Sequence, residues 1–331
     1  MSDTPSPRAH RVGRALAGGT CALILLLAGC GGGGDDAPSG ESRATRVTVQ
    51  ETAGVPSAFV AFGIEHGIFE EHGLAVELQT TQGGAATIPA LVGGEIDIGG
   101  SNVASLLLAT SKGLPIRAIA GGTTARSAGE KDFAALLAAK GKGIAAPEDL
   151  EGKTIAVNTL NNIAEVAVKA SLEKQGVDPG SIRLREVPFG DMDAALAGGT
   201  VDAALTIEPF ATESAQKGRA VLGYPYMETQ PGLQVGAYAV TDEFAETFPD
   251  AVKAFQAAIG ATADYVAGHE KELRAFLADS AQVPPKLAAA IVLPTWTGDV
   301  DADSVAGTAE MMRRYGLVDR AIDTRRLLQG G

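Results

Sequence analysis

From Arg46 onward, short apolar runs typical of β-strands alternate with stretches that have the apolar spacing of helices. The expected strands lie at 46–51, 74–78, 96–98, 116–120, 154–157, 182–187 and 201–205. Helices are expected between them at 59–65, 85–92, 103–111, 163–174, 192–197 and 210–216. Because strands separated by such helices form βαβ units, the alternation predicts an α/β fold with mainly parallel sheets flanked by helices.

A block of residues returns 105 positions later in the same setting. Residues 90–98 and 195–203 both combine a helix end, a glycine pair suited to a left-handed cap and a short strand with an aspartate. Chance agreement in a chain rich in Ala and Gly is the alternative, although the order of the flanking elements also agrees. The repeat predicts two similar lobes, with a ligand cleft where the carboxyl ends of their strands face each other.

Length and charge narrow the classes of protein that fit. A chain of 331 residues exceeds what one hydrophobic core usually supports, so two domains are expected. A content of 45% hydrophobic and 20% charged residues argues against disorder. The formal net charge of −13 repels phosphate backbones, so nucleic acid is not an expected partner.

The N-terminus carries targeting signals. Basic residues precede a short apolar run at 21–28, and the segment 1–29 is therefore predicted to be a signal peptide. Leu27-Ala28-Gly29-Cys30 resembles a bacterial lipobox, in which cleavage precedes the cysteine and the thiol carries a lipid. Residues 30–45 are predicted to be a flexible tether. We expect an extracytoplasmic protein, lipid-anchored to the outer face of a bacterial cytoplasmic membrane or periplasmic; an ordinary secretory peptide or a short anchor is the alternative.

Motifs for catalysis and metal binding fail on inspection. With only Cys21 and Cys30, neither a disulfide framework nor a cysteine metal site is expected. Gly152-Lys153-Thr154 resembles the end of a P-loop, but the required first glycine falls on Pro147 and the triplet precedes a strand. The sequence also lacks an HExxH pattern and a G-x-S-x-G elbow. It therefore predicts no enzyme activity, no metal and no cofactor.

Five segments resemble those of one protein family. They are 67–74 (Gly67 to Leu74), Gly93-Gly94-Glu95-Ile96-Asp97, 149–157 (Asp149 to Val157), 198–204 (Gly198 to Ala204) and Glu208-Pro209-Phe210. In order and spacing, from about Arg46 to Lys217, the chain is similar to the solute-binding proteins of nitrate, sulfonate and taurine ABC importers (NitT/TauT, SsuA/THI5-like) and to the related thiamine-pyrimidine binders.

The resemblance implies a two-lobe clamshell of the periplasmic-binding-protein type (type II) with two crossovers. Lobe I would hold residues 46–125 and 241–331 and lobe II residues 126–240, with crossovers near 126–140 and 230–241. It also implies a monomer that captures a small polar organic solute, of sulfonate, amine-bearing acid, pyrimidine or aromatic acid type, and delivers it to an ABC permease and ATPase. A pyrimidine-synthase-like enzyme of this fold and a ligand-sensing lipoprotein are the alternatives.

Loops after the expected strands supply most candidate ligand-binding residues. Such loops present backbone N–H groups at helix starts, where anions or carbonyl oxygens bind. Simple helix capping is the alternative for each loop, and Ser57 in particular is an expected N-cap. The predicted residues are Ser57, Gln82, Gly83, Gly84, Ser101, Asn102, Thr159, Leu160, Asn161 and Asn162.

Glu208 is expected to project a carboxylate at the mouth of the cleft, because it follows the apolar strand 203–207 and precedes Pro209. The resemblance places this Glu-Pro-Phe segment at the pocket too. Since a desolvated carboxylate needs a positive or donating partner, the ligand is expected to carry an amine, a ring N–H or a hydroxyl. The alternatives are that Glu208 caps the next helix or pairs with Arg126.

In addition to Glu208, two aromatic residues are singled out in the sequence. Phe189 is a candidate to stack on a planar ligand, with core packing as the alternative. Trp296 is the single tryptophan of the chain and is expected to pack inside the first lobe rather than to contact ligand.

Overall fold

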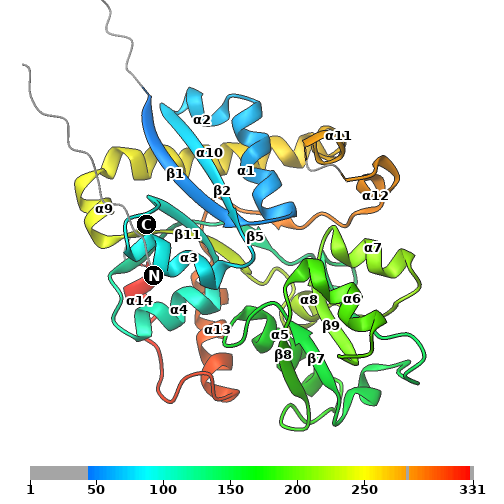
Figure 1. The fold of residues 1–331 in the computed structure, drawn as a ribbon. Coiled ribbons are helices and arrows are strands. Elements are labelled where there is room, and N and C mark those ends of the chain that lie inside the picture. The colour runs from blue at the N-terminus through cyan, green and yellow to red at the C-terminus, as the bar shows by residue number, and fades with distance from the viewer. Residues whose placement is uncertain (1–43, 281–282, 329–331) are drawn as a thin grey trace, which may run out of the picture. The chain divides into compact units, whose positions relative to one another are not determined.

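A computed structural model describes residues 44–280 and 283–328 of the chain (Figure 1). The predicted signal peptide, the predicted lipid attachment at Cys30 and nearly all of the predicted tether lie outside the described residues. Within the described residues, no helix combines the length and the apolar character that crossing a membrane requires.

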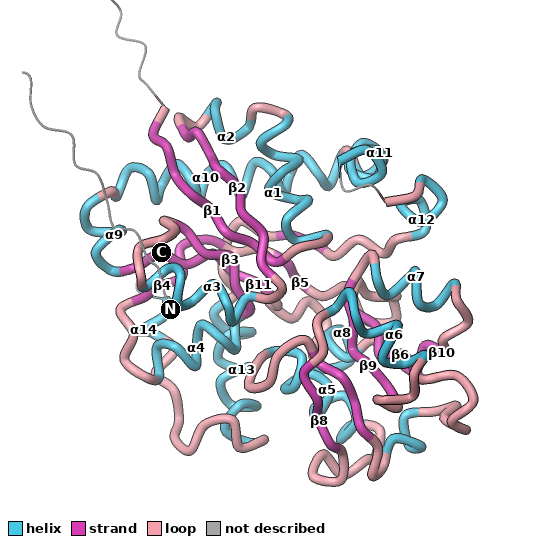
Figure 2. The backbone as a smooth tube through the Cα atoms, in the orientation of Figure 1, coloured by secondary structure: helices cyan, strands magenta, loops and turns pink. Residues whose placement is uncertain are grey.

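The first of two five-stranded sheets in the described part has the order β2-β1-β3-β11-β4 (Figure 2). β1 pairs in parallel with β2 and β3, whereas β11 pairs antiparallel with β3 and β4. The strands are β1 (Thr45–Thr52), β2 (Leu74–Thr81), β3 (Ile98–Asn102), β4 (Ile116–Ala120) and β11 (Gly236–Thr241).

The second five-stranded sheet of the described residues has the order β10-β6-β9-β7-β8. β7 pairs in parallel with β8 and β9, and β6 pairs antiparallel with β9 and β10. A short ribbon joins β5 (Thr123–Thr124) to β12 (Thr295–Trp296). The predicted α/β class with mainly parallel sheets is confirmed. The strands are β6 (Ala134–Ala138), β7 (Thr154–Val157), β8 (Arg183–Glu186), β9 (Ala203–Ile207) and β10 (Ala220–Gly223).

Helices flank both sheets, and α10 runs behind the first sheet, where it packs against β2, β4 and α1 (Figure 1). The predicted helices at 103–111, 163–174, 192–197 and 210–216 are confirmed residue for residue. The helices are α1 (Val55–Glu65), α2 (Ile68–Glu71), α3 (Gly84–Val92), α4 (Val103–Ser111), α5 (Ile163–Lys174), α6 (Met192–Ala197), α7 (Phe210–Gln216), α8 (Pro225–Thr229), α9 (Asp242–Thr247), α10 (Pro249–Gly268), α11 (Glu270–Ser280), α12 (Pro285–Ala290), α13 (Ala302–Arg314) and α14 (Arg325–Leu328), with 3₁₀ turns at Pro147–Leu150 and Phe189–Asp191.

The repeated block has the same local structure in both copies. Asp97 Oδ2 accepts from Thr48 N at 2.7 Å, and Asp202 Oδ2 accepts from Thr154 N at 2.9 Å. In each copy the aspartate's own N–H donates back to the same threonine. The strands β3 and β9 begin one residue after these aspartates, two residues later than predicted. The aspartate side chain accepts a hydrogen bond from the neighbouring strand just before the regular strand pairing starts.

The chain passes from the first sheet to the second between β5 and β6 and returns between α8 and β11. The sequence places lobe II up to residue 240, but Gly236–Thr241 forms β11 of the first sheet, because its backbone pairs with both β3 and β4. Further along, α13 packs against α4 and also against α5. The assignment of residues to lobes otherwise stays a prediction.

Phe59 of α1 and Trp296 of β12 stack in the hydrophobic cluster of the first sheet. Their ring centroids are 5.0 Å apart and the ring planes differ by 9°. Both residues are buried among side chains of α1, α10 and β1. The expectation that Trp296 packs in the core is therefore confirmed.

Candidate functional site: a pocket between the two sheets

A pocket lies where strands of both sheets end, and its empty space, open solvent at the mouth included, measures about 540 Å³. β1 and β3 of the first sheet and β7 and β9 of the second bring their carboxyl ends to it, as expected for ligand sites in α/β proteins. The lining residues are Glu51, Thr52, Pro56, Gly84, Ser101, Asn102, Gly122, Thr123, Phe133, Asn158, Asn162, Ile163, Phe189, Ile207, Tyr226, Val235, Gly236, Ala237 and Tyr238.

Asn102 connects elements of the two sheets across this pocket. Its Oδ1 accepts from Ser105 N at 2.9 Å, which caps α4, and from Ile163 N at 3.3 Å, the first residue of α5. One side chain thus accepts hydrogen bonds from free backbone N–H groups at the N-termini of two helices, which flank different sheets. The capping alternative therefore holds for Asn102, which also lines the pocket, and its contact with a ligand stays a prediction.

Asn162 is the N-cap of α5 and also lines the pocket. Its Oδ1 accepts from Ala164 N and Glu165 N at 3.0 and 3.2 Å. Its Nδ2 donates to Asn158 Oδ1 at 2.9 Å and to Thr159 Oγ1 at 2.7 Å. Because every donor and acceptor group of Asn162 is engaged, this side chain orients Asn158 in the pocket wall.

Gly84 and Ser101 meet where α3 approaches the end of β3. Ser101 Oγ donates to Gly84 O at 2.7 Å. A Cβ on Gly84 would lie 2.6 Å from Asn102 N and 2.7 Å from Ser101 Cα, closer than real Cβ contacts come. The sequence predicts that Gly84 allows a ligand to approach closely, but in the structure the backbone of β3 makes this close approach. Gly84 and Ser101 both line the pocket.

Ser57, Gln82 and Gly83 are not in the lining. α1 begins at Val55 with Gly54 as its N-cap, so the predicted N-cap at Ser57 is wrong; its Oγ donates to Gly54 O at 3.0 Å instead. Gln82 is exposed. Gly83 is buried beside Asn158, whose Nδ2 would lie 2.5 Å from a Cβ at this position.

The loop 159–161 turns away from the pocket. Asn161 has a left-handed backbone, with φ of 55°, and its N–H donates to Glu165 Oε2 at 2.8 Å. Leu160 is 39% exposed and lines a separate surface hollow with Asn161. Thr159 contributes only as the acceptor for Asn162 described above. The turn into α5 therefore leaves Asn158 and Asn162, on either side of this loop, to face the pocket.

Phe189 lines the pocket from a 3₁₀ turn and is also part of the buried cluster around the second sheet. The core-packing alternative is therefore confirmed, and stacking of this ring on a planar ligand stays a prediction.

Glu208 is not among the lining residues, and its carboxylate is held by other parts of the chain. It is 1% exposed; Oε1 accepts from Thr212 Oγ1 at 2.6 Å and from Val292 N at 3.0 Å, and Oε2 accepts from Thr212 N at 3.1 Å. The carboxylate folds back because α7 starts directly after Pro209. Burial raises the pKa of Glu208, and these hydrogen bonds oppose that rise.

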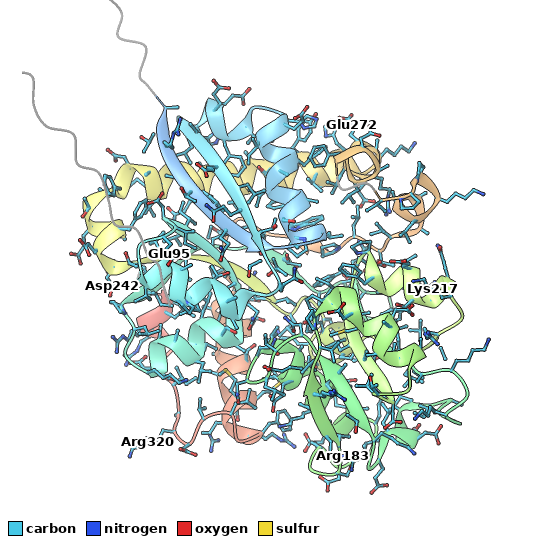
Figure 3. The ribbon with its side chains drawn as sticks, in the orientation of Figure 1. Glu95, Arg183, Lys217, Asp242, Glu272 and Arg320 are labelled. Atoms are coloured by element: carbon cyan, nitrogen blue, oxygen red, sulfur yellow. The ribbon has the colours of Figure 1, made fainter. Side chains whose placement is uncertain are left out.

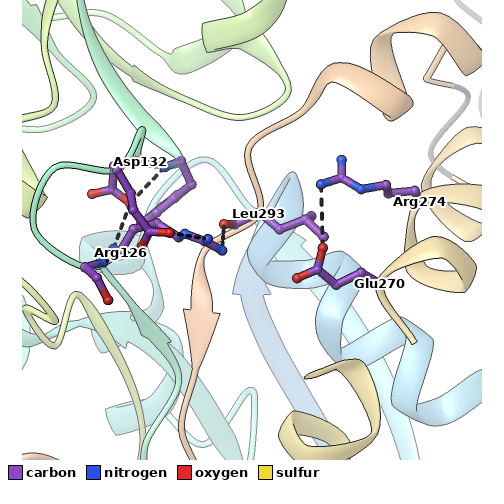
Figure 4. Close-up of polar contacts among 8 residues, drawn as sticks. Arg126, Asp132, Glu270, Arg274 and Leu293 are labelled. Carbon is purple, nitrogen blue, oxygen red and sulfur yellow. Dashed lines mark hydrogen bonds and ion pairs between the residues drawn. The ribbon is translucent and has the colours of Figure 1, made fainter. Parts of the chain in front are cut away.

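Arg126 does not supply the partner that the sequence suggests for Glu208. Its Nη2 donates to Glu130 Oε1 at 3.0 Å, and its Nη1 lies 3.5 Å from Leu293 O (Figure 4). Of the two alternatives for Glu208, capping the next helix is the one that the hydrogen bonds bear out.

Glu51 is a pocket residue that the sequence reasoning missed. It lies near the carboxyl end of β1, is 8% exposed, and lines the pocket with Tyr238 of β11. Burial raises the pKa of Glu51 to about 7. A signal was present: Glu51 follows Val47 and Val49 in the buried phase of an alternating strand, where an apolar residue is expected.

Glu51 has the only charged side chain among the lining residues of the described chain, and no Lys, Arg or His lines the pocket there. In residues 44–280 and 283–328 no cluster of three or more His, Cys, Asp or Glu residues is suited to hold a metal ion. Among the charged side chains labelled in Figure 3, Arg183, Asp242, Glu272 and Arg320 lie near the edge of the view.

Comparisons with known proteins agree with this arrangement. Residues 57–273 match the sequence model described as NMT1/THI5 like. The taurine-binding periplasmic protein of Escherichia coli (strain K12) is 27% identical over 235 residues, which cover 71% of each chain.

Solved structures show the fold. The alkanesulfonate-binding protein SsuA from Xanthomonas axonopodis pv. citri, bound to MOPS, superposes with a TM-score of 0.73 at 16% identity, covering 86% of this chain and 98% of that one. The periplasmic nitrate-binding protein NrtA from Synechocystis PCC 6803 has a TM-score of 0.70 at 15% identity, with coverages of 85% and 84%.

Proposed function

Because this chain belongs to the NMT1/THI5-like family, we propose that it is an extracytoplasmic solute-binding protein that captures a small polar organic molecule between its sheets and delivers it to an ABC permease and its ATPase. The observation that carries the proposal is the pocket, which takes its walls from the strand ends of both sheets. The named relative in Escherichia coli is itself a binding protein.

Binding would act through closure of the two sheets on the solute. The hydrogen bond between Asn102 of the first sheet and Ile163 N of the second crosses the pocket wall. A solute that touches both sides adds contacts that exist only in the closed arrangement, and so it shifts the population toward closure. The segments 125–133 and 230–235, which connect the sheets, are the proposed hinges, and the permease would recognise the closed form.

A ligand screen tests the proposed function. We expect one class among sulfonates, amines, pyrimidines and aromatic acids to raise the melting temperature by several degrees, because a ligand at 100 times its Kd stabilises the native state by about 2.7 kcal/mol. The measurement is a thermal melt of the mature chain with each compound. A complete absence of shifts across the four classes would contradict the proposal.

The proposed location includes a lipid anchor at Cys30, which lies outside the described residues. We expect Cys30→Ala to move the protein from the detergent phase to the aqueous phase in detergent partitioning of whole cells, because the acylated thiol is lost. Cys21→Ala is the matched control and should leave partitioning unchanged, since that cysteine lies in the predicted signal peptide. Equal partitioning of Cys30→Ala and the unsubstituted protein would contradict lipidation.

A further inference from the structure

The carboxylate of Glu51 is buried in the pocket wall, and the groups that donate hydrogen bonds to it are neutral. Thr52 N donates to its Oε1 at 2.6 Å, and the hydroxyls of Tyr238 and Thr52 also donate to the carboxylate. Gly100 on the adjacent strand β3 leaves the space that this carboxylate occupies, because a Cβ there would collide with it. The chain thus makes room for a carboxylate at the pocket.

The other buried carboxylates of the described residues, those of Asp132, Glu165 and Glu208, do not line the pocket. Glu208 accepts three hydrogen bonds, and Glu165 pairs with Lys169 Nζ at 2.6 Å. Asp132 accepts from three backbone N–H groups. A carboxylate has about four acceptor positions, so Glu51 keeps acceptor capacity beyond its three hydrogen bonds, at a place where it borders empty space.

The pocket itself supplies no positive side chain within the described residues, so a cation for Glu51 has to come from the bound molecule. We propose that Glu51 selects the solute: the pocket takes a small molecule with a positively charged nitrogen, which donates to the Glu51 carboxylate. This inference rests on the proposed function. In this proposal Glu51, rather than Glu208, is the carboxylate that pairs with the amine of the ligand.

The rest of the wall suits the remaining part of such a molecule. The N-terminal ends of α3, α4 and α5 reach the pocket at Gly84, Asn102 and Ile163. Helix N-termini and the amide groups of Asn158 favour a polar or acidic end group. The apolar side chains of Phe133, Phe189 and Ile207 border the same space.

The affinity for a charged amine should depend on pH. Burial raises the pKa of Glu51 to about 7, whereas the unfolded value is near 4.5, so the unliganded pocket gains its charge as the pH rises through about 7. The other titratable groups of the lining are Tyr238 on β11 and Tyr226 on α8, and burial raises the pKa of both, which keeps them neutral. Affinity is therefore expected to be roughly tenfold higher at pH 8 than at pH 6, with proton release on binding near pH 7.

The test uses pairs of probes that differ only in amine or hydroxyl: taurine and isethionate, β-alanine and 3-hydroxypropionate, ethanolamine and ethylene glycol. Calorimetry at pH 7.5 on the full mature chain should show at least one amine binding on the order of 100-fold more tightly than its hydroxyl partner. Glu51→Gln should remove most of that preference and the proton release. Glu208→Gln, a buried carboxylate that does not line the pocket, is the matched control and should keep both, with thermal melts to verify that each variant folds.

Equal affinity for amine and hydroxyl partners, or an unchanged preference in Glu51→Gln, would overturn the selection by Glu51 while the binding function stands. The same conclusion follows if compounds without an amine bind in the ligand screen and no amine does. Failure of every compound in both experiments would instead overturn the proposed function.

Discussion

Replacement of Phe59 by alanine is expected to lower the free energy of unfolding by about 3–5 kcal/mol, the usual cost of deleting a buried phenyl ring. Phe59 is fully buried in α1, and its ring stacks on Trp296 at a centroid distance of 5.0 Å. Trp296 pairs with Thr123 in the β12–β5 ribbon, and Thr123 lines the pocket. The cavity would therefore loosen a wall of the pocket as well as the core. Urea denaturation measures the change.

Phe248→Ala is the control for this substitution. Phe248 is 50% exposed and precedes α10, so its truncation should change the free energy of unfolding by about 0.5 kcal/mol or less. If Phe59→Ala cost no more than Phe248→Ala, the stacked pair could not be a principal contact of the first core.

Gly84→Ala is expected to cost about 1–3 kcal/mol of stability and to weaken solute binding by roughly tenfold or more. The added Cβ would lie 2.6 Å from Asn102 N and 2.7 Å from Ser101 Cα, and backbone atoms cannot rotate away as a side-chain tip can. Relief requires α3 and β3 to separate, which displaces Ser101 and Asn102 in the pocket wall. Calorimetry with a solute found in the screen and urea denaturation measure the two effects.

Gly260→Ala provides the matched control for the added methyl group. Gly260 lies within α10, and a Cβ there would have no atom within 4 Å. Because alanine favours helix and restricts the unfolded chain, this variant should gain about 0.5–1 kcal/mol and keep its affinity. Full affinity in Gly84→Ala would show that the pocket does not depend on this close approach.

Local sequence determined most of the secondary structure. The helix at 163–174 is fixed by the Asn162 cap and its apolar face, and the aspartates of the repeated block grip a neighbouring strand in both copies. The helix depends on residues close in sequence, and the block depends on one contact that recurs in both copies. Both can therefore be predicted from the sequence pattern. Predicted pocket residues such as Ser101 and Asn102 follow from the rule that loops after parallel strands meet at one edge.

Strand β11 could not be assigned from its neighbours in sequence. Gly236–Thr241 lies between β3 and β4, whose residues are more than 100 positions earlier. The sequence of an apolar stretch does not specify which sheet it joins, because strand pairing depends on contacts with strands that are distant in sequence. The sequence therefore indicated a crossover where the fold has a central strand of the first sheet.

The sequence by itself determined the α/β class and the repeated block, and it predicted a carboxylate at the pocket. Only the tertiary structure decided which carboxylate that is. Glu208 is turned toward Thr212 and toward Val292, which is 84 positions away, whereas Glu51 shares the pocket with Tyr238 of a strand 187 positions away. A side chain's local sequence fixes its element and phase, but its partners, its burial and hence its charge come from segments that only folding brings together.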